Sequence, residues 1–157
     1  MAYVTITIGG HYLRLREAGG NSRLWADGRA IEADATFERV ELGHGRIALR
    51  TLDGRYLTMR PDHHQNFGLY PEPELTPAAA FEEVLWPTGQ VSLRSSDLTY
   101  VGVQVRGRTA VTVNRTEPAL TERFFFVPVP AGMVPRQRRA SDAEPGLQPV
   151  PPAGTAL

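Results

Sequence analysis

The sequence predicts an all-β domain built from three similar units. Two columns of aromatic residues recur at an interval of 44 residues, shortened once to 43: Tyr12, Tyr56 and Tyr100, and Phe37, Phe81 and Phe124. A constant interval of this length marks positions that have the same role in successive structural units. Only "PELTPAAAFEEV" approaches the apolar spacing of a helix, and there Pro77 and the alignment of Phe81 with Phe37 favour a loop that enters a strand. Strands are therefore expected throughout.

Each unit contains extended segments that are rich in β-branched or aromatic residues and bounded by Gly, Pro, Asp and Asn. The first segment of a unit is a strand, a turn and a second strand, as in "IALRTLDGRYLTMR", where Asp53-Gly54 is typical of a hairpin turn. Two single strands follow it. In chain order the segments are 5–15, 22–26, 37–40, 47–60, 67–71, 81–84, 91–103, 110–114 and 124–127.

Three units of four strands predict a β-trefoil, a short barrel capped by three hairpins. A propeller also has blades of four strands, but it needs at least about four blades to close. The Tyr column, the Leu/Val column and the Phe column, which Val40, Val84 and Val127 follow, are expected to fill the barrel. The predicted domain covers residues 1–130. Residues 131–157 have no periodicity and are rich in Pro, Ala and Gly, so a disordered tail is expected there.

Composition excludes several classes of function. Seventeen arginines balance seventeen acidic residues, so no overall charge favours nucleic acid or an anionic membrane. Cysteine and lysine are both absent, which removes disulfides, thiolate metal sites and Schiff-base chemistry. No G-x-S-x-G, H-E-x-x-H or glycine-rich phosphate loop is present. We therefore expect a non-catalytic protein without a cofactor or a metal.

The N-terminal residues have no basic segment followed by an apolar run, and no segment is long and apolar enough to span a bilayer. A cytoplasmic monomer is the expectation.

The sequences of the repeats resemble those of fascin-like, actin-crosslinking β-trefoil domains. The phrases that carry the resemblance are "GRIALRTLDGRYLTMR" and "RLWADGRAIEADATFERVEL". The likeness covers roughly residues 3–129, and it is weaker in the third unit, where "SDLTYVG" replaces "DGRYL". It implies a binding role on actin filaments, although bundling needs two binding surfaces and this chain has one such domain. Some phrases also resemble arabinofuranose-binding trefoil modules, while the Q-x-W signature of ricin-type lectins is absent.

Two sets of residues are candidates for binding. If Leu24 and Leu69 point inward, alternation turns the neighbouring rings of Trp25 and Tyr70 outward, where they would stack on a sugar. The second set lies in and beside the polar loop "RPDHHQNFG" and the preceding hairpin, and its candidates for contacting a protein are Arg55, Arg60, His63, His64 and Asn66.

Neighbouring histidines do not easily share one ion, so no metal site is predicted there. The sequence favours recognition of a protein partner, with filaments among the candidates, and leaves carbohydrate binding through Trp25 and Tyr70 open as the alternative.

Overall fold

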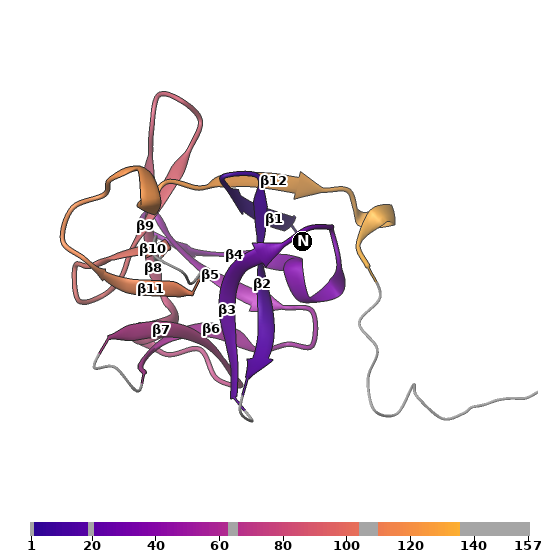
Figure 1. Ribbon diagram of the computed structural model, residues 1–157, viewed down its shortest axis with the longest axis horizontal. Coiled ribbons are helices and arrows are strands. Elements are labelled where there is room, and N and C mark those ends of the chain that lie inside the picture. Colours follow the sequence, from indigo (N-terminus) through magenta and orange to yellow (C-terminus); the bar gives the residue numbers. More distant parts are fainter. Residues whose placement is uncertain (1, 19–20, 63–65, 104–109, 136–157) are drawn as a thin grey trace, which may run out of the picture.

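The computed structural model describes residues 2–18, 21–62, 66–103 and 110–135, and these form twelve strands and four 3-10 turns, with no α-helix among them (Figure 1). The strands are β1 (Ala2–Ile8), β2 (His11–Ala18), β3 (Asn21–Gly28), β4 (Phe37–Gly43), β5 (Arg46–Thr51), β6 (Tyr56–Pro61), β7 (Phe67–Glu72), β8 (Phe81–Leu85), β9 (Val91–Arg94), β10 (Tyr100–Val103), β11 (Val111–Arg115) and β12 (Phe125–Val129). The 3-10 turns are η1 (Ala33–Ala35), η2 (Pro77–Ala79), η3 (Leu120–Glu122) and η4 (Ala131–Met133).

The first and last strands of each unit form a closed antiparallel barrel. The pairs β1–β4, β4–β5, β5–β8, β8–β9 and β12–β1 run around it. A bridge between Val91 and Phe124 completes the circle between β9 and the residue before β12. Closure leaves these strands with partners on both sides, so the described strands of the barrel present no free edge to another chain.

The middle strands of each unit form three hairpins, β2–β3, β6–β7 and β10–β11. The hairpins also contact one another, since Thr112 pairs with Gly68 and Trp25 forms a bridge with Ala110. Figure 1 shows β3 beside β2 in front and β7 beside β6 below. This is the predicted β-trefoil, with the hairpins gathered at one end of the barrel.

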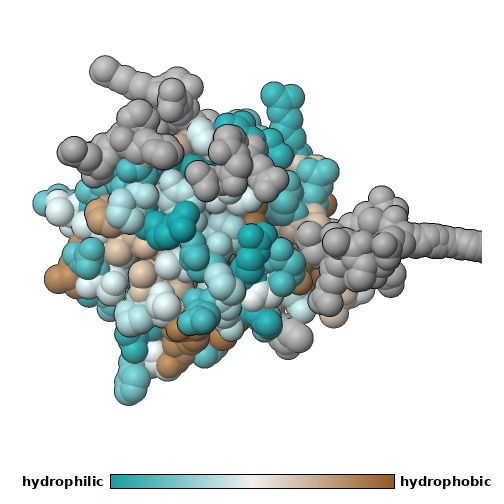
Figure 2. All heavy atoms as spheres, turned by 90° about the horizontal axis from the view of Figure 1, so that it is seen from below, coloured by the Kyte–Doolittle hydropathy of each residue, from teal (hydrophilic) through white to brown (hydrophobic). Residues whose placement is uncertain are grey.

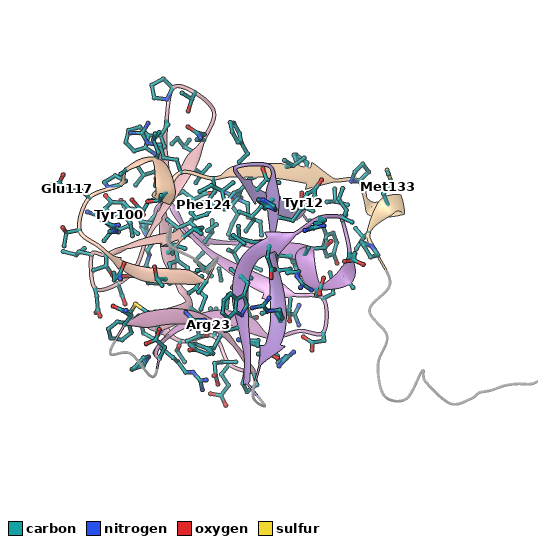
Figure 3. All side chains as sticks on the ribbon, in the orientation of Figure 1. Tyr12, Arg23, Tyr100, Glu117, Phe124 and Met133 are labelled. Atoms are coloured by element: carbon teal, nitrogen blue, oxygen red, sulfur yellow. The ribbon has the colours of Figure 1, made fainter. Side chains whose placement is uncertain are left out.

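The predicted core columns are largely confirmed. Phe37, Phe81 and Phe124 are completely buried, and Figure 3 places Phe124 in the interior between the strands. The columns Leu13, Leu57 and Val101, and Leu24, Leu69 and Val113, are buried as well. Repetition of these side chains supplies one continuous core for the three units.

Two predictions about the core are wrong. The tyrosine column is half-buried: each residue lies at the start of a hairpin strand, and a tyrosine loses less by burying its apolar body than by burying its hydroxyl. Val127 is 43% exposed, since it lies three residues after the buried Phe124 and an odd step along a strand reverses the face. A shared interval therefore marks a shared role, and that role is not always burial.

The predicted boundary at residue 130 falls just after β12. Residues 131–133 form η4, in which Met133 donates a backbone hydrogen bond to Pro130. The rest of the predicted tail, residues 136–157, lies outside the described residues. Among the described residues no helix has the length and apolarity needed to cross a membrane.

Candidate functional site

The structure brings Trp25 and Tyr70 together through an arginine that the sequence did not single out. Arg23, on β3, lies with its guanidinium carbon 5.6 Å from the centre of the Trp25 ring and 5.4 Å from that of Tyr70. Its Nη2 donates a hydrogen bond of 3.0 Å to the carbonyl of Val111 on β11. Figure 3 labels Arg23 where β3 and β7 meet, so one side chain links all three hairpins.

Gly68 makes room for Arg23. Each unit has a residue before its inward-pointing Leu or Val, and these equivalent positions hold Arg23, Gly68 and Thr112. A Cβ at position 68 would lie 2.8 Å from Cζ of Arg23, which is closer than real Cβ contacts. The sequence signal for this contact was a large charged residue and a glycine at equivalent positions of two units. That signal can be interpreted only once the hairpins are known to contact one another.

Tyr70 is 7% exposed, so the prediction that its ring points outward is wrong. Strand alternation exposes every second residue only where one face of the sheet meets water. The β6–β7 hairpin packs against β3 and β11, and both Leu69 and Tyr70 are therefore covered. Arg60 also lies over the Tyr70 ring, at 4.5 Å from its centre, while its Nη1 pairs with Glu72 at 2.7 Å.

Trp25 is half-buried, and a second guanidinium covers its ring. Arg16 lies 4.1 Å from the ring centre, and its Nη1 is 2.6 Å from a carboxylate oxygen of Asp27. A sugar that stacks on Trp25 has to compete with this cation, which is attracted to the ring face and is held by an ion pair. The two rings thus form a packed arginine–aromatic cluster and do not present an open platform.

Asn66 joins two hairpins. Its side-chain oxygen accepts a hydrogen bond of 3.3 Å from Asn114 on β11, and its backbone N–H donates to the Asp62 side chain at 3.1 Å. His63 and His64 lie outside the described residues. Among the described residues no group of three or more His, Cys, Asp or Glu is placed to hold a metal ion.

Arg55 lies in the turn between β5 and β6, at the other end of β6 from Arg60. Its Nε is 3.0 and 3.2 Å from the two carboxylate oxygens of Asp53, and its backbone N–H donates to the hydroxyl of Thr51 at 2.9 Å. The Thr51 hydroxyl donates in turn to Asp53. Burial opposes the ionisation of Asp53, but the hydrogen bonds from Arg55 and Thr51 outweigh it and lower the pKa of Asp53.

Two clefts flank the 51–54 turn. The cleft between the first and second units, here called the seam cleft, has a volume of about 210 Å³. Its lining consists of Leu15, Ser22, Ala33, Asp34, Thr51, Leu52, Asp53 and Arg55. The other cleft, of about 240 Å³, shares Thr51, Leu52 and Asp53 and adds Tyr3, Glu38, Arg50 and Gly54. Arg55 is thus the one predicted contact residue that lines either of them.

Asp34, which η1 places in the seam cleft, has an unusual environment. Burial raises the pKa of Asp34, the nearby Arg14 opposes this, and the negative charge of Glu32 adds to it. Nη1 of Arg14 is 3.6 Å from Oδ2 of Asp34, which is beyond hydrogen-bond distance, and Oδ1 is buried without a partner. The Asp34 side chain is nevertheless 40% exposed. Asp34 was not among the predicted site residues, and its sequence context, "EADATF", offers no local sign that one of its oxygens is buried.

The surface around the hairpins is mixed in character. Figure 2 views the molecule from below Figure 1, and on this face hydrophilic residues separate the hydrophobic ones into small areas. Areas of this kind do not mark an extended apolar interface. Binding at this end would therefore depend on polar groups and on the shape of the clefts.

No protein-family model and no curated protein matches the chain. Solved structures do match it. The designed three-fold symmetric protein ThreeFoil is 13% identical with a TM-score of 0.66, over 80% of this chain and 97% of that one. An endo-β-galactosidase from Clostridium perfringens that releases GlcNAcα1-4Gal is 14% identical with a TM-score of 0.66, over 82% of this chain and 33% of that one.

Two toxins are also similar. The Haemophilus ducreyi cytolethal distending toxin is 15% identical with a TM-score of 0.66, over 80% of this chain and 83% of the matched one. A mosquitocidal holotoxin is 8% identical with a TM-score of 0.69, over 85% of this chain and 18% of that one. The chain has a β-trefoil fold. At these identities the likeness extends to the fold alone, and the resemblance to the fascin-like family stays a prediction.

Proposed function

We propose that the chain is a non-catalytic β-trefoil module of the fascin-like kind that recognises a protein partner through the 51–55 turn and the clefts beside it. The neighbours in a glycan-releasing enzyme and in two toxins support a role in binding. The module acts in the cytoplasm as a monomer, without a cofactor, in this proposal.

The size of the clefts carries the choice of a protein partner. Pockets for small ligands and cofactors have volumes of roughly 300–1,000 Å³, whereas the two clefts measure about 210 and 240 Å³. Each suits a single side chain of a partner better than a complete ligand. Between them, the turn presents Asp53 and Arg55 already held by hydrogen bonds, so little side-chain entropy is lost when a partner docks.

Carbohydrate binding through Trp25 and Tyr70 is the second candidate, and the endo-β-galactosidase neighbour favours it. It requires Arg16 to leave the Trp25 ring and Arg60 to leave the Tyr70 ring, with the loss of contacts to Asp27 and Glu72. These displacements cost free energy that a sugar would have to supply. We therefore rank it below a protein partner.

Co-sedimentation with actin filaments tests the proposal, because the fascin-like resemblance points to that partner. Arg55→Glu is expected to weaken binding tenfold or more, while Arg115→Glu, the same change of charge on the exposed end of β11, leaves it unchanged. A glycan that quenches tryptophan fluorescence saturably, with the response abolished in Trp25→Ala, together with no sedimentation of the wild-type chain, would overturn the proposal.

A further inference from the structure

Arg123 lies closer to an aromatic ring than any other described arginine. Its Cζ is 3.7 Å from the centre of the Trp86 ring. Within the described part of the chain Arg123 has no ion pair, so its charge is not compensated. Four other described arginines lie over rings, and each of those also pairs with a carboxylate: Arg16 with Asp27, Arg23 with Asp62, Arg50 with Glu38 and Arg60 with Glu72.

One edge of the Arg123 guanidinium is open to a ligand. Its Nε is buried and has no hydrogen-bond partner, whereas Nη1 and Nη2 have no partner among the described residues and are not enclosed. A guanidinium offers two parallel N–H donors to a carboxylate, and a charge-assisted pair of this kind is stronger than a neutral hydrogen bond. The accessible Nη groups are therefore the part of Arg123 that can bind an anion.

Trp86 and Arg123 are held in place by neighbouring polar groups. The indole Nε1–H of Trp86 donates to the hydroxyl of Ser92 at 2.8 Å, and that hydroxyl donates to the backbone carbonyl of Glu122 at 2.6 Å. The carboxylate of Glu122 does not neutralise Arg123, because it is buried and accepts hydrogen bonds from the backbone of Ala119 and the hydroxyl of Thr121. A partner would thus meet a preorganised ring and cation, which lowers the entropy lost on binding.

Two exposed apolar side chains lie in the same row as Arg123. Phe124 exchanges two backbone hydrogen bonds with Val91, and its side chain is completely buried. Side chains at odd steps from Phe124 point the other way along this extended backbone. Phe125 and Val127 accordingly are 45% and 43% exposed. We call Trp86, Arg123, Phe125 and Val127 the β12 surface, and Figure 1 shows β12 beside β1 at the top of the molecule, away from β6 and β7.

The chemistry of the β12 surface fits an acidic segment of a protein. Tryptophan and arginine are the residue types that most often dominate the binding energy of protein interfaces. Phe125 and Val127 offer apolar contact that an inorganic anion such as phosphate could not use. The unpaired positive charge of Arg123 selects a carboxylate, and a partner with the same sign of charge would be repelled.

We propose that the β12 surface is a docking site for a protein segment in which an aspartate or glutamate lies next to apolar side chains. The carboxylate pairs with the Nη groups of Arg123, and the apolar side chains pack on Phe125 and Val127. The inference goes beyond the proposed function, because it concerns residues apart from the 51–55 turn and its clefts. A domain with two docking surfaces can hold two partners together.

The test is an NMR titration of the full-length chain with the peptide acetyl-Leu-Glu-Leu-amide. The matched control is acetyl-Leu-Gln-Leu-amide, which has the same size and lacks the charge. We expect saturable shifts at millimolar concentration for the indole N–H of Trp86 and the amides of residues 123–127, with an affinity at least tenfold lower for the control peptide. Trp25 is the other tryptophan of the chain, and its indole signal serves as the internal reference.

Two variants with matched controls locate the interaction. Arg123→Gln is expected to weaken the glutamate peptide at least tenfold, while Arg115→Gln, on the exposed end of β11, leaves it unchanged. Phe125→Ala is expected to weaken it at least threefold, while Leu75→Ala, which removes a side chain of 46% exposure elsewhere, does not. The Phe125 variant keeps the test valid if Arg123→Gln disturbs the packing of Trp86. Equal affinity in the wild type, Arg123→Gln and Phe125→Ala would overturn the inference.

Other occupants of the β12 surface give different results. A wild-type chain that dimerises in sedimentation velocity, and that Arg123→Gln returns to a monomer, would assign the surface to a second copy and overturn the inference. The chain also has acidic residues after β12 in the sequence, Asp142 and Glu144. Peptide binding that appears only after Asp142→Asn and Glu144→Gln are combined would assign the surface to the chain's own C-terminal segment and likewise overturn it.

The outcomes also separate the inference from the proposed function. Filament binding that depends on Arg55, together with no response to the glutamate peptide, overturns the inference and leaves the proposed function standing. Peptide binding that depends on Arg123, together with no sedimentation on filaments, supports the inference and overturns the proposed function.

Discussion

Gly68→Ala is expected to destabilise the fold because it removes the space that Arg23 occupies. A Cβ at position 68 would lie 2.8 Å from Cζ and 3.2 Å from Nε of Arg23, and it would also meet Nη2. The backbone at Gly68 is not in the left-handed region, so an alanine fits there in itself. The clash with the guanidinium is the whole reason for the expected loss.

The magnitude follows from what Arg23 gives up when it moves. Its hydrogen bond to the carbonyl of Val111 is charge-assisted and contributes about 1.5–3 kcal/mol, and each ring contact contributes about 0.5–1 kcal/mol. Replacing a glycine whose backbone suits alanine returns about 0.4–1 kcal/mol. We expect a net loss of about 3 kcal/mol, or roughly 6 to 12 °C in Tm for a domain of this size.

A double-mutant cycle measured by urea unfolding isolates the contact. In the Arg23→Ala background the clash is gone, so Gly68→Ala should be neutral or slightly stabilising, and the coupling energy should be about 3 kcal/mol or more. Gly132→Ala is the matched control, since a Cβ there meets nothing within 4 Å. The same loss from Gly68→Ala in both backgrounds would refute the idea that Gly68 exists to accommodate Arg23.

Three further predictions concern other side-chain contacts. Gly102→Ala should cost about 1–3 kcal/mol in urea unfolding, because its Cβ would lie 2.9 Å from Cγ of the buried Glu122; no loss would contradict this packing. Glu83→Gln should lower the free energy of unfolding by about 1–3 kcal/mol, because the Glu83 side chain is 14% exposed and its carboxylate is bonded to Arg39 on β4. Glu82→Gln is the control, since the Glu82 side chain is 43% exposed, and it should cost about 0–1 kcal/mol. Equal effects would argue against burial as the cause. The third prediction compares two variants by unfolding between about pH 3 and 7: Asp34→Asn should gain stability relative to the wild type as the pH rises from 3.8 through the raised pKa of Asp34. Asp53→Asn should instead lose stability relative to the wild type as the pH rises through the lowered pKa of Asp53 towards 3.8. The same trend in both variants would refute one of the two assignments.

The repeat pattern in the sequence was sufficient to predict the architecture. The tyrosine, leucine and phenylalanine columns predicted three units of four strands, and the Asp53-Gly54 turn marked where β5 ends and β6 begins. This was possible because strand pairing and core formation depend on the alternation of apolar and polar residues and on the residues that form turns. Both patterns are local, and they repeat in each unit of the chain. The same logic failed at Tyr70 and Val127, because alternation does not say how many faces of a strand are covered.

Which side chains meet across the units follows from the arrangement of the strands in space and not from the sequence pattern. Arg23 lies 45 positions before Gly68, and Asp34 lies 21 positions before Arg55, yet each pair shares one site. No local pattern constrains such pairs, since convergence of the hairpins and closure of the barrel bring them together. The covered ring of Tyr70 and the seam cleft are consequences of that convergence.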